Sequence, residues 1–197
     1  MPYDAILNGL YLDDDRVVPV IPNITKGWHD QNIRKNFDKI MAASSKKGIA
    51  IGNLGWIEPF VETGIPVIGD YGLNLFNSID FLLAGELGVK EAIISHESDP
   101  EEILAMDFHG VIPEVVLKGK IPLMTSEHFL VGDLNLCAQK EEWERFSLKD
   151  RKGQFYPILT NPADCRSVIL SHKETNLLMW KDDLKKSGIK RFRIYAE

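Results

Sequence analysis

Two short polar segments of this chain each follow an apolar segment, and their residue types can do chemistry. Residues 69–78 follow Ile65–Ile68, and residues 95–99 follow Glu91–Ile94. Together they supply carboxylate, carboxamide, hydroxyl and imidazole groups, which bind polar substrates and transfer protons. The candidate residues are Asp70, Asn74, Ser95, His96 and Glu97.

Alternation along an extended segment divides the second cluster between two faces. Ser95 and Glu97 can share one face, whereas His96 points the other way, so a Ser–His pair made of neighbours is not expected. We therefore predict Glu97 as a general acid or base. Asp70, Asn74 and Ser95 are predicted to bind and orient a polar substrate. For Asp70 and Asn74, holding the loop through backbone amides is an equal alternative.

A second acid–base pair, Glu127 and His128, follows the apolar segment that ends at Met124. We predict His128 as a second catalytic residue, with a purely structural histidine as the alternative. The sequence contains no Gly-x-Ser-x-Gly elbow, no His-Glu-x-x-His motif and no glycine-rich phosphate loop. These absences exclude elbow-type serine hydrolases, zincin metalloproteases and P-loop nucleotide-binding proteins.

The order of strand, polar loop, helix, strand and polar loop is typical of a parallel α/β fold, in which loops at the carboxyl ends of the strands carry the chemistry. Asn77 is predicted to cap a helix over residues 79–87. Roughly four or five strand–helix units precede residue 125, whereas a closed barrel needs eight. We therefore predict an α/β fold, with a partial (β/α) TIM-type barrel or an open parallel sheet over residues 1–125. A β-rich extension with one helix is expected over residues 126–197.

A partial barrel leaves strand edges unpaired, and proteins rarely leave such edges bare. Three coverings are possible. The carboxyl-terminal extension can pack on the sheet, a second copy can form a homodimer, or a missing amino-terminal half can complete the barrel.

The composition is ordinary for a globular protein, with 44% hydrophobic and 26% charged residues among 197. No apolar run is long enough for a membrane helix, and the start of the chain lacks a signal-peptide profile, so we expect a cytoplasmic protein with no membrane partner. The net charge of −6 opposes binding of a polyanion by the molecule as a whole. Basic residues in 149–152 and 185–193 are most simply a solvated turn and helix end, with a nucleic-acid surface as the alternative.

Several motifs occur in order along the chain. They are Asp70, Leu73, Asn74, Asn77 and Ser78, then Leu87–Val89, then Ser95 and Glu97, then Pro122–His128, and finally Leu148–Pro157. In this order they resemble motifs of the collagenase-like peptidases, a family of unclassified catalytic mechanism. The resemblance extends from about residue 48 to the end and covers only the back half of the family's catalytic domain, without its opening strands.

The resemblance implies a TIM-type barrel and a peptidase with a peptide or protein substrate. It also raises the interest of Lys149, Asp150 and Arg151, because a hairpin folded over the mouth of the barrel would let them bind an anionic or peptide substrate. Arg151 would then be the anion clamp. Asp150 and Arg151 can alternatively pair with each other beside the turn.

Some members of this family carry an iron–sulfur cluster and take part in oxygen-independent hydroxylation of RNA bases or quinone precursors. Of the four cysteines that the family pattern implies, only Cys137 and Cys165 are present, while Phe129 and Trp143 stand near the other two places. Two thiolates do not hold a four-iron cluster. We therefore expect no cofactor and two unligated thiols, with a mixed metal site of His128, Cys137 and Cys165 as the weaker alternative.

Three functions follow as hypotheses. The first is a collagenase-like peptidase. The second is a degenerate relative of the RNA- or quinone-hydroxylation proteins, with RNA as a possible partner. The third is a non-catalytic binding or assembly domain of a longer protein.

Overall fold

We analysed a computed structural model, which describes residues 1–10, 14–130, 145–161 and 166–195. The chain folds into two compact units. Unit 1 comprises residues 1–116 and 180–193, and unit 2 comprises residues 117–179 and 194–197. The predicted division at residue 125 therefore lies nine residues beyond the first boundary between the units, and a later segment returns to unit 1.

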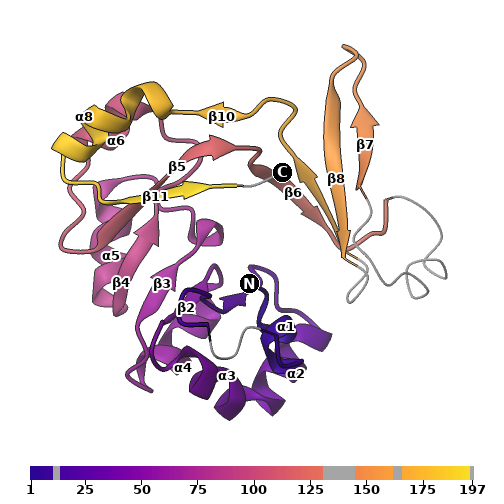
Figure 1. The fold of residues 1–197 in the computed structure, drawn as a ribbon, viewed down its shortest axis with the longest axis vertical. Helices are drawn as coiled ribbons and strands as arrows, with labels where there is room; N and C mark the ends of the chain where they lie inside the picture. Colours follow the sequence, from indigo (N-terminus) through magenta and orange to yellow (C-terminus); the bar gives the residue numbers. More distant parts are fainter. Residues whose placement is uncertain (11–13, 131–144, 162–165, 196–197) are drawn as a thin grey trace. The chain divides into compact units, whose positions relative to one another are not determined.

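Unit 1 alternates strands and helices along the chain (Figure 1). Its strands are β1 (Val20–Ile21), β2 (Ile49–Ile51), β3 (Val67–Gly69), β4 (Val89–Ile93), the first part of β5 (Ile112–Gly119) and most of β11 (Arg191–Ile194). Its helices are α1 (Tyr3–Leu7), α2 (Trp28–Lys35), α3 (Phe37–Ser44), α4 (Ile57–Val61), α5 (Ser78–Glu86), α6 (Pro100–Ala105) and α8 (Lys181–Lys186). The 3-10 turns are η1 (Leu54–Trp56), η2 (Tyr71–Leu73) and, at the second boundary between the units, η3 (Leu178–Trp180).

The strands β1 to β5 lie side by side in chain order, and each neighbouring pair is parallel. Beyond β1, Pro2 forms an isolated parallel bridge with Val20 of β1. Strand β11 also pairs with β5. The predicted α/β fold with a parallel sheet is thereby confirmed. The sheet does not close into a barrel among the described residues.

Alternation places the residues of the parallel sheet on two different faces. One row across the sheet, Ile21, Ile51, Gly69 and Ala92, is almost fully buried. The neighbouring row contains Glu91, and a further carboxylate, that of Glu114, follows two residues along β5 from the partner of Glu91. Because side chains alternate between faces, the two carboxylates lie on the opposite face from the apolar row.

Local signals place most helix starts where the sequence predicts them. Asn77 accepts hydrogen bonds from the backbone amides of Ile79 and Asp80, and the Asp80 side chain completes a capping box for α5. Asp99 and Glu102 form the same motif at α6. These polar caps satisfy amides that the first turn of a helix leaves without partners.

Two helices differ from the sequence-based expectation. The spacing of Ile33, Phe37, Ile40 and Met41 predicts a single helix over residues 28–43, but the structure has α2 and α3, divided at Asn36. The side-chain amide of Asn36 donates to the carbonyl and the side chain of Asn32, a local interaction that competes with regular helix geometry. The start signal at Ser98–Glu102 and the later Gly110 predict a helix that ends near His109, but the helix ends at Ala105 because Met106 is extended (ψ 139°).

Unit 2 is built mainly of antiparallel strands. Strands β6 (Pro122–Ser126), β9 (Arg166–Leu170), β8 (Phe155–Asn161) and β7 (Arg145–Lys149) form one sheet in that order, and β10 (Thr175–Asn176) pairs with the end of β5. The predicted hairpin is confirmed, since Lys149 pairs with Phe155 across a turn in which Gly153 has φ 82°. No helix of the described residues is long and apolar enough to cross a bilayer.

Candidate functional site

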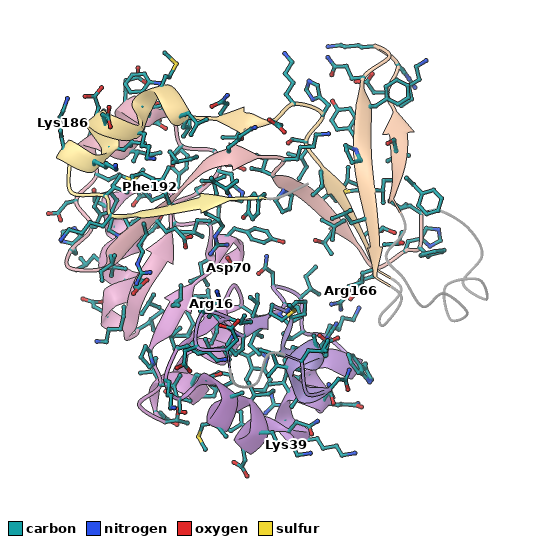
Figure 2. The ribbon with its side chains drawn as sticks, viewed as in Figure 1. Arg16, Lys39, Asp70, Arg166, Lys186 and Phe192 are labelled. Carbon is teal, nitrogen blue, oxygen red and sulfur yellow. The ribbon has the colours of Figure 1, made fainter. Side chains whose placement is uncertain are left out.

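The carboxylate of Asp70 lies directly after β3 and is almost fully buried. Asp70 (labelled in Figure 2) accepts a hydrogen bond of 2.6 Å from Nη1 of Arg193, a residue of β11. The same guanidinium donates from Nε and Nη2 to the two carboxylate oxygens of Glu114 on β5, both at 3.0 Å. Such a bidentate pair is among the strongest geometries for an arginine and a carboxylate.

A second arginine of β11 binds the next strand. Arg191 donates to Glu91 on β4 at 2.8 Å, and it stands two residues before Arg193, on the same side of β11. The two arginines therefore bind carboxylates from the loop after β3, from β4 and from β5. Burial alone lowers the pKa of Arg193, but its hydrogen bonds to Glu114 and the charge of Asp70 outweigh burial and raise that pKa above its ordinary value.

Beside this ion-pair cluster, the loops after β3 and β4 bring two rings together. The rings of Tyr71 and His96 stack with centroids 5.6 Å apart and an interplanar angle of 23°. Burial lowers the pKa of His96, and although the charge of Asp70 opposes this effect, the charge of Arg193 adds to it. Burial, together with Asp70, raises the pKa of Tyr71. His96 is therefore a neutral imidazole at pH 7, able to accept a proton.

Hydrogen bonds fix the same two loops to each other. Ser95 Oγ donates to the Asn74 side-chain oxygen at 2.6 Å and accepts from the backbone amide of Glu97 at 3.1 Å. Asn74 has a left-handed backbone (φ 49°), a conformation that asparagine tolerates better than most residues. The predicted binding residues Asn74 and Ser95 are thus brought together, and their contacts to one another hold the loop.

The two predicted carboxylates do not have the same surroundings. Asp70 is buried and paired with Arg193, whereas Glu97 is exposed. Alternation along the loop after β4 favours Glu97 over His96 as the acid or base. The half-buried position of His96 against Tyr71 instead favours the imidazole.

Three consecutive loops meet closely at Asn23, a residue that the sequence patterns do not single out. The Asn23 side chain lies between Gly52, after β2, and Gly72, after β3, at positions that a Cβ on either glycine would occupy. Asn53 donates from its side chain to the carbonyl of Asn23 at 3.0 Å and to the hydroxyl of Thr25 at 3.3 Å. Gly52 and Gly72, each in a loop after a strand, are the signal in the sequence for this close approach.

The remaining polar groups of these loops have structural contacts. The side chain of Asn77 is a helix cap, as predicted, and Asp99 is the cap of the next helix. The hydroxyl of Ser98 is buried without a hydrogen-bond partner among the residues described. Polar atoms in that condition are rare in proteins.

The predicted residues of unit 2 lie in two places. The Glu127 carboxylate pairs with the buried Arg166 at 3.2 Å, and His128 is exposed. Asp150 accepts hydrogen bonds from the backbone amides of Lys152 and Gln154, so its carboxylate stabilises the hairpin turn.

The two cations beside Asp150 are exposed. Lys149 lies 5.4 Å from the ring centre of Phe155, whereas Arg151 stands at the tip of the turn. The Asp150 oxygen that accepts hydrogen bonds faces backbone amides of the turn. In the described part of the hairpin no ion pair joins Asp150 to Arg151, so the alternative pairing of these two residues lacks a supporting contact.

The cysteines of the weaker metal alternative, Cys137 and Cys165, lie outside the described residues, as does Trp143. The described residues contain no group of three or more histidine, cysteine or acidic side chains that could hold a metal ion. Phe129, near a place where the resemblance implies a cysteine, is a buried ring.

Comparison with family models, with curated proteins and with solved structures found no match to this chain. The resemblance to the collagenase-like peptidases consequently stays a prediction.

Proposed function

We propose that this chain is a peptidase of the collagenase-like type, acting at the carboxyl ends of the strands of unit 1. We propose further that the parallel sheet is part of a TIM-type barrel and that the protein acts in the cytoplasm on peptides or proteins. The observation that carries the proposal is the half-buried imidazole of His96, stacked on Tyr71 beside the Asp70–Arg193 pair.

The strand order supports the barrel. Consecutive parallel strands joined by helical segments are the building unit of (β/α) barrels, and their functional loops follow the carboxyl ends of the strands. Asn23, Asp70 and His96 all lie in such loops, after β1, β3 and β4 respectively.

In the proposed reaction, His96 first accepts a proton and then donates it. As a base, the imidazole takes a proton from a water molecule while the water oxygen bonds to the peptide carbonyl carbon. It then gives that proton to the leaving amine as the C–N bond breaks. Since burial keeps His96 neutral, the base form is present at pH 7 without further help. Asn74 and Ser95 hold the loops that carry the two rings.

Hydrolysis of a fluorogenic peptide mixture and of gelatin by the whole chain tests this proposal. The His96→Gln variant should lose about 99% of the rate or more, an effect within the usual range for removing an acid–base catalyst. His109→Asn is the matched control, because His109 precedes the start of β5 whereas His96 follows the end of β4, and because asparagine accepts its left-handed backbone (φ 47°). A wild-type chain that hydrolyses neither substrate, or a fully active His96→Gln variant, contradicts the proposal.

Glu97→Gln separates the two possible bases. If the exposed carboxylate of Glu97 were the base, this variant would lose the rate and His96→Gln would retain it. We expect the reverse, because Glu97 is exposed to solvent and His96 is partly sheltered from it.

A non-catalytic binding domain is the second candidate function. The observation in its favour is that the charged side chains of this region, including Asp70, Glu114 and the two arginines of β11, form ion pairs within the protein. Peptide binding without hydrolysis, unchanged by His96→Gln, would be the result that identifies this function.

A further inference from the structure

The outward positions of α5 are apolar. Residues 79, 82, 83, 86 and 87 follow the spacing i, i+3, i+4, i+7 and i+8, which places them along one side of a helix. Four of the five are isoleucine or leucine. Their exposed fractions are 73% for Ile79, 42% for Leu82, 53% for Leu83 and 39% for Leu87. We call these four residues the α5 stripe.

The stripe is not the side on which α5 packs. Phe81 and Ala84, on the opposite side, are buried, and the Phe81 ring contacts Phe108 edge-on at 5.0 Å. The helix therefore already has its core contacts. An additional row of exposed aliphatic side chains on a folded helix marks an interaction surface more often than a chance arrangement.

The helices around the stripe carry acids and no bases. No lysine or arginine occurs in α4, α5 or α6, whereas Glu58, Asp80, Glu86, Glu101 and Glu102 do. These helices are neighbours: Val61 at the end of α4 lies against Gly88 after α5, and the amide of Asp107 after α6 binds Ser78 Oγ of α5.

Three of these acids are available to a partner. Glu58, Glu86 and Glu101 are exposed and make no ion pair with the described part of the chain. The bases of the other helices are Arg34 and Lys35 of α2, Lys39 of α3, and Lys181, Lys185 and Lys186 of α8; α8 contacts α6 but not α5 among the element pairs with several contacts.

We propose that the α5 stripe is the docking site of an amphipathic helix of a partner protein, whose apolar side carries leucine-like residues and whose flanks are basic. An apolar row flanked by acids is complementary to such a helix, as in groove recognition of basic amphipathic segments. The proposal does not depend on the peptidase site, since the stripe and His96 lie on different elements. Two identical stripes would each carry the Glu86 carboxylate into the contact with no base on α5 to neutralise it, which disfavours a second copy as the occupant.

The size of the stripe limits the partner. Residues 79 to 87 span about 12 Å along the helix axis, or about two turns. A partner helix therefore needs apolar residues over two or three turns, with lysine or arginine at the positions that face Glu58, Glu86 and Glu101.

Two synthetic helices of about 18 residues test the proposal, one of leucine and lysine and one of leucine and glutamate with the same pattern. Binding of each to the whole chain is measured by fluorescence anisotropy at two salt concentrations. We expect the leucine–lysine helix to bind and the leucine–glutamate helix not to bind. The double variant Ile79→Gln, Leu83→Gln should weaken binding at least about tenfold, because glutamine keeps the helix but not the apolar surface.

Two controls match this variant. Leu123→Gln changes a leucine of similar exposure in unit 2, and Asp182→Asn removes an acid of α8; both should bind as the parent does. Glu86→Gln should weaken binding and reduce its salt dependence.

Equal binding of the two synthetic helices, or undiminished binding by the double variant, overturns the proposal. Absence of any binding overturns it also. A dimer of the chain that the double variant dissociates would assign the stripe to a second copy and reject the basic helix. Circular dichroism of each variant shows whether the fold is intact.

Discussion

Arg193 Nη1 donates a 2.6 Å hydrogen bond to Asp70, a residue 123 positions earlier in the chain. The same guanidinium reaches Glu114, 79 positions earlier. One side chain near the end of the sequence therefore holds two carboxylates of the parallel sheet, and it supplies the counter-charge that a buried carboxylate needs.

Replacing Arg193 with methionine should destabilise the fold by about 3 kcal/mol, because Asp70 would be left buried without its counter-charge. Urea denaturation measures the loss. Arg191→Met is the matched control, since Arg191 is mostly exposed and its pair with Glu91 is worth about 1 kcal/mol or less. Adding Asp70→Asn to Arg193→Met should restore part of the stability. Equal losses of stability in the two arginine variants would contradict the role of Arg193 as the counter-charge of Asp70.

The lowered pKa of His96 predicts a pH dependence of stability. The folded pKa lies below the unfolded value of about 6.5, so the unfolded chain binds the proton first as the pH falls. Above about pH 7 both states are neutral and His96 contributes nothing to this dependence. As the pH is lowered from about 6.5 towards the folded pKa, the free energy of unfolding should decrease more steeply in the parent than in His96→Gln. Identical slopes in urea titrations across this window would contradict the half-buried imidazole.

The contact of Asn23 with two glycines predicts a suppressor. Gly52→Ala should cost about 2 kcal/mol through overpacking, since the new Cβ meets the Asn23 side chain. Asn23→Ala should relieve most of that cost. Gly72→Ala should not be relieved in the same way, because its Cβ also meets the Gly52 carbonyl oxygen at 2.5 Å. Chemical denaturation of the three single and two double variants decides this, and equal rescue of both glycine variants would be evidence against it.

Removing the cap of α5 should weaken the fold. Asn77→Ala takes away the acceptor for two backbone amides and should lower the free energy of unfolding by about 1 kcal/mol. Asn77→Asp retains the acceptor and should remain within a few tenths of a kcal/mol of the parent. If the alanine variant unfolds at the same urea concentration as the parent, the cap has no energetic role.

Features that depend on neighbouring residues are the ones that the sequence predicts well. The capping residue Asn77 binds amides two and three positions away, and the hairpin turn after Lys149 is closed by Asp150 and Gly153. The parallel sheet also follows from local patterns, since strands and helices of suitable length alternate. Local competition explains a failure as well, because Asn36 divides a helix whose apolar spacing alone is continuous.

The candidate site is predictable only in part. The sequence locates Asp70, Asn74 and Ser95 in the loops after two strands, and the structure brings Asn74 and Ser95 into contact. The sequence does not identify Arg193 as the partner of Asp70, because nothing in the 122 residues between them specifies that contact. Which of His96 and Glu97 is sheltered from water depends on how the loop packs against Tyr71.

The alternation of strands and helices, the caps and the hairpin can be predicted from the order of residues, because each of these rests on interactions within a few positions. Three relationships emerge only from the folded chain: Arg193 binds Asp70 and Glu114, Asn23 lies between two glycines, and the leucines of α5 face solvent. They come from packing between elements distant in the chain, where burial and charge pairing select one partner among many that the sequence permits.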